Sequence, residues 1–191
     1  MRLFLATTFP PDVIRPVNDR IAAIRSKLPA ASWTRPEAQH LTLAFLGDRD
    51  EKIVEKLAPL VAEAVAEVGR FEATVQGYGF FPNPRHARVG WVGVEPAERF
   101  AELALAVRGA VSAAGIELDR GEFRPHLTLC RIRDRWPPLS IETFCRALRD
   151  YRSDVFPVEK VTLFVSKLNP NGAVHTVVRE FALAPSVAAG S

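Results

Sequence analysis

Residues 40–43 read His40-Leu41-Thr42-Leu43, and residues 126–129 read His126-Leu127-Thr128-Leu129. In a β-strand, alternate side chains share a face, so each histidine is predicted to project with its threonine while both leucines point toward the core. Each tetrapeptide would then be half buried and half available to a ligand. With average residue frequencies, this tetrapeptide has a chance on the order of one in a hundred thousand at a given position. Its recurrence therefore indicates a duplication.

Other landmarks share the 86-residue spacing of the two histidines. The turn dipeptide Asn83-Pro84 corresponds to Asn169-Pro170, and the start of the first predicted helix at Pro11 corresponds to Ala97. A true duplication holds one offset along its whole length. The sequence therefore predicts two repeat units, a closing strand and a short tail, over residues 2–87, 88–173, 174–184 and 185–191.

Hydrophobic periodicity predicts that strands and helices alternate in both units. The predicted strands cover residues 2–8, 39–46, 71–80, 88–94 and 125–132, with two more flanking residues 169–172. The predicted helices cover residues 11–28, 50–68, 96–114 and 140–148.

The predicted fold class is therefore α+β, in a single bilobal domain of residues 1–191. We expect two lobes related by a pseudo-twofold axis, each a mainly antiparallel sheet with helices on its outer face. The lobes would flank a central cleft. The axis would bring the two His-x-Thr pairs to opposite sides of that cleft.

The composition is that of a globular protein, with 191 residues of which 48% are hydrophobic and 25% charged. The apolar run Leu3–Ala6 is too short for a signal-peptide core and no membrane segment is found, so a cytoplasmic protein without a membrane partner is expected. We also expect a monomer. Cys130 and Cys145 match neither a C-x-x-C site nor a disulfide framework, and both are predicted to be reduced, buried thiols. The net charge of +3 suits a polyanionic partner such as nucleic acid without requiring one.

Two imidazoles that face each other across a cleft indicate general acid–base catalysis, because histidine holds either protonation state near neutral pH. The hydroxyls of Thr42 and Thr128 would bind the oxygens of a tetrahedral anion. Phosphodiester cleavage fits these groups without a metal or another cofactor. The residues alone do not say whether His40 or His126 is the acid.

Two other interpretations of the motifs stay open. A duplicated structural strand could keep both histidines without any chemistry. Histidine is also a common zinc ligand, but no carboxylate shares the strand face with either pair, and a His-x-x-x-His spacing is absent. The sequence also lacks a Walker loop, a dinucleotide fingerprint and a nucleophile elbow.

Around these motifs the sequence resembles the RNA 2',3'-cyclic phosphodiesterases of the two-histidine phosphoesterase superfamily, once called 2'-5' RNA ligases, whose signature is a pair of H-x-T-x motifs. The resemblance covers nearly the whole chain, including Arg2–Ala6, Gln39–Gly47 and Phe123–Arg131. The resemblance implies a bilobal fold with a central cleft. It also implies an enzyme that opens the 2',3'-cyclic phosphate at an RNA terminus to a 2'-phosphate and that can form a 2'-5' linkage. It also implies that His40 is the proton donor and His126 the proton acceptor.

The same chemistry on a small nucleotide, such as a cyclic phosphate of ADP-ribose, is one alternative. A non-catalytic module that binds RNA ends is another. Both keep the fold and the cleft, and only a turnover assay separates them from the main interpretation.

Arg131 is a candidate substrate-binding residue, because such enzymes commonly have a basic residue after the second motif and a guanidinium can pair with two phosphate oxygens. Strand parity places it on the face opposite to Thr128 unless the strand ends or bulges there. A substrate role and a solvated surface arginine are both open. His86 and His175, which lack the x-Thr partner, are predicted to be exposed hairpin histidines.

Trp33 could offer a stacking face to a terminal base, but aromatic residues in strands more often belong to the core, so Trp33 is not assigned to a site. Arg35 could contact phosphates along the RNA, but scattered arginines usually serve solubility.

Overall fold

The computed structural model describes residues 1–119, 121–169 and 172–185. Pro170 of the second predicted turn and residues 186–191 of the predicted tail lie outside this part. The elements are, in chain order, β1 (Arg2–Thr7), α1 (Pro11–Arg25), β2 (Ser32–Trp33), η1 (Pro36–Ala38), β3 (Leu41–Asp48), α2 (Ile53–Val68), β4 (Phe71–Phe81), η2 (Pro84–His86), β5 (Val89–Glu95), α3 (Ala97–Ala113), β6 (His126–Arg131), α4 (Pro138–Leu148), β7 (Phe156–Val158), β8 (Lys160–Asn169) and β9 (Gly172–Ala182).

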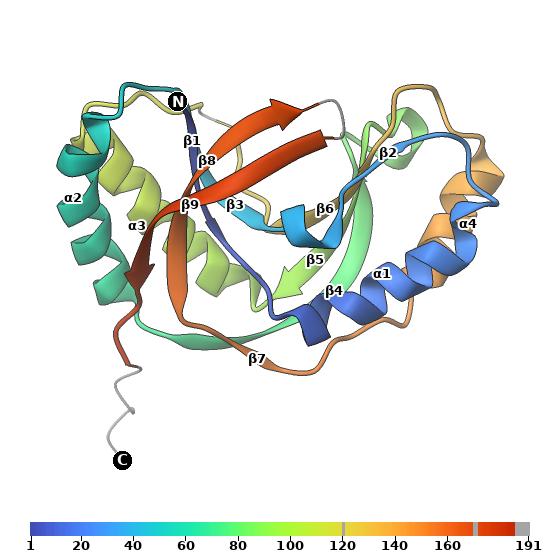
Figure 1. Cartoon of the computed structure of the whole chain (residues 1–191). Coiled ribbons are helices and arrows are strands. Elements are labelled where there is room, and N and C mark those ends of the chain that lie inside the picture. The colour runs from blue at the N-terminus through green and yellow to red at the C-terminus, as the bar shows by residue number, and fades with distance from the viewer. Residues whose placement is uncertain (120, 170–171, 186–191) are drawn as a thin grey trace, which may run out of the picture.

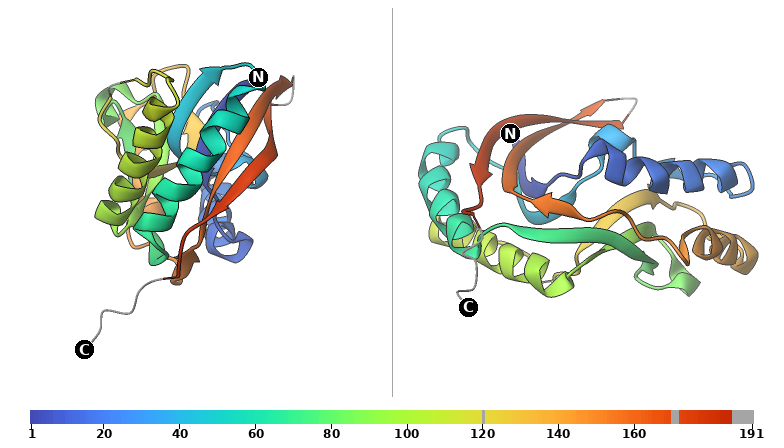
Figure 2. Two further views of the ribbon diagram at one scale, coloured as in Figure 1. Left: turned by 90° about the vertical axis from the view of Figure 1, so that its left-hand side faces the viewer. Right: turned by 90° about the horizontal axis from the view of Figure 1, so that it is seen from below.

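The strands form two sheets whose neighbours are all antiparallel, with the orders β3-β1-β8-β9 and β2-β6-β5-β4-β7. Helices α2 and α3 lie at one end of the molecule and α1 and α4 at the other, with the strands between them (Figures 1 and 2). The predicted α+β class with two antiparallel sheets is confirmed. In the described residues, no helix is long and apolar enough to cross a membrane.

Each sheet takes strands from both predicted repeat units. In one sheet, β1 of the first unit lies between β3 of the same unit and β8, which pairs in turn with β9 near the end of the chain. In the other sheet, β4 of the first unit pairs with β5 of the second. The helices exchange in the same way, because α2 packs against α3 and α1 against α4. Neither unit forms a lobe by itself. The boundaries of the units stay a prediction.

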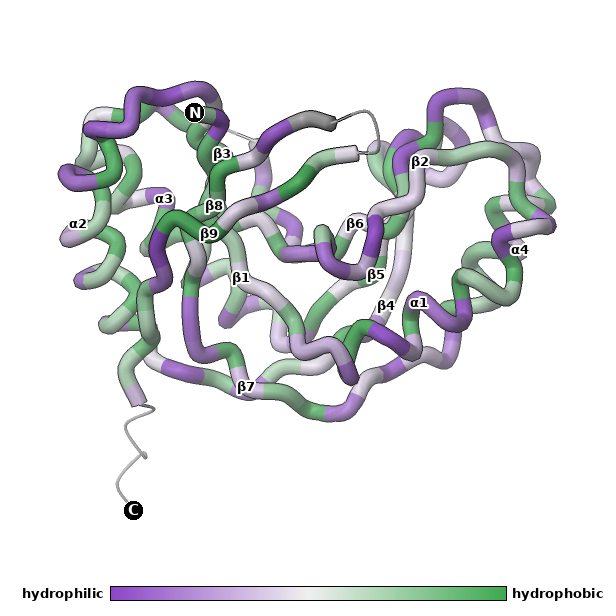
Figure 3. Tube along the Cα trace, viewed as in Figure 1, coloured by the Kyte–Doolittle hydropathy of each residue, from purple (hydrophilic) through white to green (hydrophobic). Residues whose placement is uncertain are grey.

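The core lies between the helices and one face of each sheet. Hydrophobic and hydrophilic residues alternate along α2 and α3 (Figure 3), and Leu57 of α2 and Phe100 of α3 are fully buried. In β1, Leu3 and Leu5 join this core, whereas Phe4 packs in a small separate cluster on the opposite face. Burying one large aliphatic or aromatic side chain contributes about 1.5–3 kcal/mol. The inner faces therefore hold the sheets rigid and leave the other faces available for a site.

Several predicted boundaries differ from the structure by a few residues. The strand predicted over residues 39–46 is β3, Leu41–Asp48, so that His40 lies immediately before the strand, after the short 3-10 helix η1. The strands β2 and β7 were not predicted, because runs of two or three residues are too short to show a period.

Candidate active site

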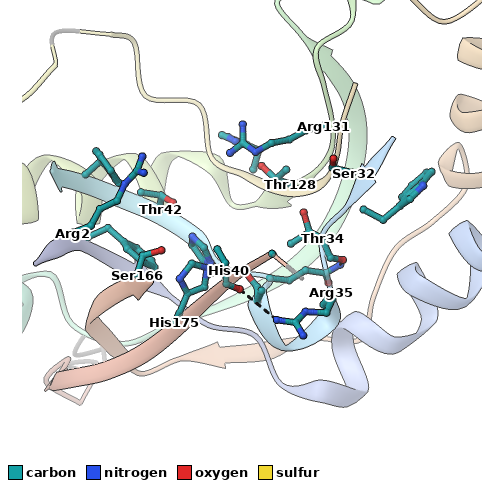
Figure 4. Close-up of a pocket in the computed structure, with 18 residues that line it drawn as sticks. Arg2, Ser32, Thr34, Arg35, His40, Thr42, Thr128, Arg131, Ser166 and His175 are labelled. Carbon is teal, nitrogen blue, oxygen red and sulfur yellow. Dashed lines mark hydrogen bonds between the residues drawn. The ribbon is translucent and has the colours of Figure 1, made fainter. Parts of the chain in front are cut away.

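The two motifs line one cavity of about 620 Å³ (Figure 4). Its walls come from β1, β3, β8 and β9 of the first sheet and from β2 and β6 of the second, together with residues that precede β3. His40, Thr42, His126 and Thr128 all face it. The leucines of both motifs are buried in the core, as predicted, with at most 1% of their surface exposed. The structure therefore places both His-x-Thr pairs at one cleft.

A β-bulge brings Arg131 into the same cavity. Thr128 and Cys130 of β6 pair with consecutive residues of β5, so that Leu129 is an extra residue in the ladder. Leu129 and Cys130 are consequently both buried, and the alternation restarts one residue later. Arg131 therefore returns to the face of Thr128 and lines the cavity. The bulge that a substrate role of Arg131 requires is therefore present.

The first motif contains the same bulge. Thr42 and Ala44 of β3 pair with consecutive residues of β1, which leaves Leu43 as the extra residue. Leu43 and Ala44 are both buried, and Phe45 faces the cavity with 47% of its surface exposed. The two motifs thus share a β-bulge as well as their sequence. Phe45 follows the bulge of the first motif as Arg131 follows the bulge of the second.

Each histidine ring is anchored to a main-chain carbonyl two residues before it. The Nδ1 atom of His40 lies 2.8 Å from the oxygen of Ala38, and that of His126 lies 2.7 Å from the oxygen of Arg124. A carbonyl oxygen only accepts hydrogen bonds, so Nδ1 must carry the hydrogen in both rings. The Nε2 atom is then left to exchange a proton with a ligand.

Burial lowers the pKa of His40 to about 4. The hydrogen bond to Ala38 opposes this shift, and the nearby charges of His175, His126 and Arg131 add to it. Burial also lowers the pKa of His126, where the hydrogen bond to the carbonyl of Arg124 raises it and Arg131 lowers it further. Both rings are therefore neutral at pH 7 in the ligand-free cleft. An anion bound there would raise both pKa values.

A family model described as the 2'-5' RNA ligase superfamily matches residues 10–170. The chain belongs to this superfamily. Among curated relatives, an RNA 2',3'-cyclic phosphodiesterase of Aquifex aeolicus is 36% identical over 162 residues, which cover 79% of this chain and 81% of the relative. Another, of Thermotoga maritima, is 30% identical over 183 residues and covers 94% of each chain. The resemblance seen in the sequence is confirmed.

Solved structures share the fold. A crystal structure of a Thermus thermophilus protein superimposes with a TM-score of 0.76 at 30% sequence identity and covers 97% of this chain and 100% of that one. Escherichia coli LigT complexed with 3'-AMP gives a TM-score of 0.70 at 24% identity, covering 95% and 97% of the two chains. This second likeness shows the fold alone.

Beyond the two His-x-Thr pairs, the cleft contains a third histidine. His175 of β9 lines the cavity and is partly buried, so the prediction of an exposed hairpin residue was wrong. Its ring meets the ring of His40 edge-on, with the two ring centroids 5.0 Å apart. The ring centroids of His175 and Phe4 are 4.9 Å apart. Burial lowers its pKa. No local motif marks His175, because its position depends on how β9 pairs with β8.

Two further cavity residues were not assigned to the site from the sequence. Trp33 and Arg35 both line the cavity, although Trp33 also packs against the buried Trp136, with centroids 6.3 Å apart. The Nη2 atom of Arg35 donates to the main-chain oxygen of Ala173 at 3.5 Å. This bond links the loop before His40 to β9. Trp33 thus packs against the core and also lines the cavity, and Arg35 is an exposed arginine that also lines the cavity.

The described residues contain no group of three or more His, Cys, Asp or Glu side chains that could hold a metal ion. Among the described side chains that line the cavity, none is a carboxylate. Both cysteines are free. Cys130 is buried, which raises the pKa of its thiol to about 11; Cys145 is partly exposed, so the prediction of two buried thiols holds only for Cys130.

Proposed function

We propose that this chain is an RNA 2',3'-cyclic phosphodiesterase that opens the terminal cyclic phosphate to a 2'-phosphate by metal-independent acid–base catalysis. One observation carries the mechanism: two histidines line the same cavity, and each is anchored through Nδ1 so that Nε2 is left for proton transfer. The names of the Aquifex and Thermotoga relatives support the substrate.

In the proposed reaction, Nε2 of His126 accepts a proton from a water molecule whose oxygen attacks phosphorus. The bond between phosphorus and the 3'-oxygen breaks, and His40 donates a proton to that oxygen. Thr42 and Thr128 donate hydrogen bonds to the non-bridging oxygens. The products are a 3'-hydroxyl and a 2'-phosphate. The assignment of donor and acceptor follows the resemblance to the superfamily.

The donor role of His40 requires a proton that the ligand-free cleft does not hold at neutral pH, because its pKa is about 4 there. The negative charge of the bound phosphate would raise the pKa of His40, since an opposite charge within about 4–6 Å favours the protonated ring. Substrate binding would therefore create the acid that the reaction needs.

Arg131 would bind the reacting phosphate. It faces the cavity from the same strand as Thr128, and it is close enough to lower the pKa of both histidines. Its guanidinium can donate two parallel hydrogen bonds to phosphate oxygens. Charge on the phosphate in the transition state would then be balanced without a metal ion.

The same groups would support 2'-5' ligation if a 5'-hydroxyl takes the place of water. His126 would then accept the proton of that hydroxyl, and the bond to the 3'-oxygen would break as before. In the reverse direction the two histidines exchange roles by microscopic reversibility. Water is far more concentrated than RNA ends, so hydrolysis would dominate.

The experiment gives the purified protein an oligoribonucleotide with a terminal 2',3'-cyclic phosphate in excess chelator. We expect a 2'-phosphate end, identified by its resistance to an enzyme that removes only 3'-phosphates and by mass. Binding without turnover would refute the catalytic proposal and indicate a module for RNA ends. Turnover of a cyclic phosphate of ADP-ribose but not of the oligoribonucleotide would show that the substrate is a small nucleotide and not RNA.

A further inference from the structure

A row of polar side chains crosses the cleft face of the first sheet. The strand register places Arg2 of β1 opposite Ser166 of β8, and Ser166 opposite His175 of β9. All three line the cavity. Neighbouring strands lie about 4.8 Å apart, so the row extends over about 10 Å. It thus presents a guanidinium, a hydroxyl and an imidazole on one rigid surface.

The donors of this row are not committed to protein partners. Arg2 forms no ion pair within the described residues, although Asp48 stands opposite it in the register with β3. Its guanidinium lies over the ring of Phe45 at 5.1 Å, which holds it at the cavity. In the same part of the chain, the Nδ1 atom of His175 is buried without a hydrogen-bond partner, although the residue itself lines the cavity. These groups favour an anion, since the part of the cavity wall that the structure describes contains no carboxylate.

The row lies on the side of His40 that faces away from the second motif. His175 is 5.0 Å from the ring of His40 and acts on its pKa, but it is not among the groups that shift the pKa of His126. Arg131, in contrast, acts on both. Figure 4 shows Arg2, Ser166 and His175 on one side of His40, and Thr128 and Arg131 on the other. The row is therefore displaced from the reacting phosphate.

We propose that Arg2, Ser166 and His175 form a second phosphate subsite, which binds the internucleotide phosphate immediately upstream of the terminal cyclic phosphate. This inference rests on the proposed function and specifies its substrate class as oligoribonucleotides of two or more nucleotides. A mononucleotide would leave the subsite without a ligand. A phosphate contact fixes position without reading the base, so the preference would depend on length and not on sequence.

The test compares kcat/KM for three substrates: a nucleoside 2',3'-cyclic phosphate, a dinucleotide with the same terminus, and that dinucleotide with an uncharged methylphosphonate linkage. Hydrogen bonds to charged groups are strong enough to change affinity by roughly tenfold or more. We expect the wild-type enzyme to prefer the charged dinucleotide over each of the other two substrates by at least roughly that factor.

The variants Arg2→Gln and His175→Gln should each lower this preference toward unity. Arg179→Gln is the matched control, because Arg179 lies on β9, outside the residues that line the cavity, and its loss removes the same charge. It should keep the wild-type preference. Circular dichroism of each variant checks the fold, and the comparison of linkages in the wild-type enzyme needs no variant.

The outcomes separate the two proposals. Hydrolysis of all three substrates with equal kcat/KM would overturn the subsite and leave the phosphodiesterase intact. A preference that Arg179→Gln abolishes as strongly as Arg2→Gln would also overturn it, because overall charge would then be the cause. Absence of hydrolysis from every cyclic phosphate would overturn the proposed function and the subsite with it.

Discussion

The pH dependence of turnover tests the histidine pair directly. The pKa of His40 is lowered to about 4 and that of His126 lies below its ordinary value of 6.5. At pH 7 a donor with a pKa of 4 holds its proton in about one molecule in a thousand. Because kcat/KM reports the free enzyme, we expect a bell-shaped profile with an acid limb near pH 4 and a basic limb below pH 6.5. Both limbs are macroscopic values of the coupled pair.

Substrate should move both limbs to higher pH. The cyclic phosphodiester carries one negative charge, and an opposite charge at close range shifts a pKa by about 1–3 units toward the charged form. The profile of kcat reports the enzyme–substrate complex. Its limbs are therefore expected about one to three pH units above those of kcat/KM. The diester itself does not titrate in this range.

The assay measures initial rates on a cyclic-phosphate oligoribonucleotide between about pH 3.5 and pH 8.5, at constant ionic strength because salt screens the charges. Single variants assign the roles. Loss of the donor removes the fall at high pH, so His40→Gln should keep only the rising limb. Loss of the acceptor removes the rise, so His126→Gln should keep only the falling limb. Circular dichroism at each pH excludes unfolding as the cause.

Two results would refute this reasoning. Limbs at the same pH in kcat and kcat/KM would show that the phosphate does not act on the histidines. A kcat/KM that keeps rising above pH 7 would mean that the lowered pKa values do not govern the reaction. An exchange of the residual limbs between the two variants would keep the pair but reverse donor and acceptor.

Four further outcomes follow from the site. His40→Ala and His126→Ala should each lower kcat by roughly a hundredfold or more, the scale of lost acid–base assistance; undiminished single-turnover rates in either variant would contradict the pair. Arg131→Gln should lower kcat/KM by about tenfold or more, whereas Arg133→Gln, which lies outside the cavity-lining residues, should not. Excess EDTA should leave kcat unchanged, and a strong dependence on added zinc would contradict the metal-free mechanism. The free energy of unfolding should fall as the pH drops from 6.5 to 4, because His40 has a pKa of about 4 in the folded protein and therefore binds its proton first in the unfolded chain. Urea titrations should assign up to about 3 kcal/mol of this loss to His40. The variant His40→Gln should show a smaller loss.

The duplicated motif was sufficient to predict the cleft and four of its side chains. Equivalent residues of two repeats are expected at equivalent positions in the structure, and this expectation does not depend on which strands pair. It could not predict which strands pair, because an offset relates positions along the chain and not neighbours in a sheet. The exchange of strands and helices between the units follows from long-range packing, which periodicity does not record.

Arg131 shows where strand parity is too simple a guide. The sequence did contain a signal, because Leu129-Cys130 and Leu43-Ala44 are consecutive apolar pairs inside strands that should alternate. Such a pair indicates that two successive residues point into the core, which requires a bulge. A bulge at both places, as the structure shows, returns the following residue to the cleft.

His175 could not have been found in this way. It has no threonine two residues later that would repeat the motif, and nothing near it in the sequence distinguishes it from a surface histidine. It reaches the cleft because β9 pairs with β8, and β8 with β1, which carries Phe4. Residues that depend on three strands from opposite ends of the chain become visible only in the structure.

The two histidines need different surroundings to work together. Acid–base catalysis requires one ring to be charged while the other is neutral, and two identical environments would give both rings the same pKa. Both rings have the same kind of anchor, a main-chain carbonyl two residues earlier, but their neighbours differ. His40 packs against Phe4 and the ionisable His175, with centroids 4.7 and 5.0 Å away, whereas His126 packs against Phe81 at 4.8 Å. In the proposed mechanism, the bound phosphate together with these different neighbours would decide which ring holds the proton.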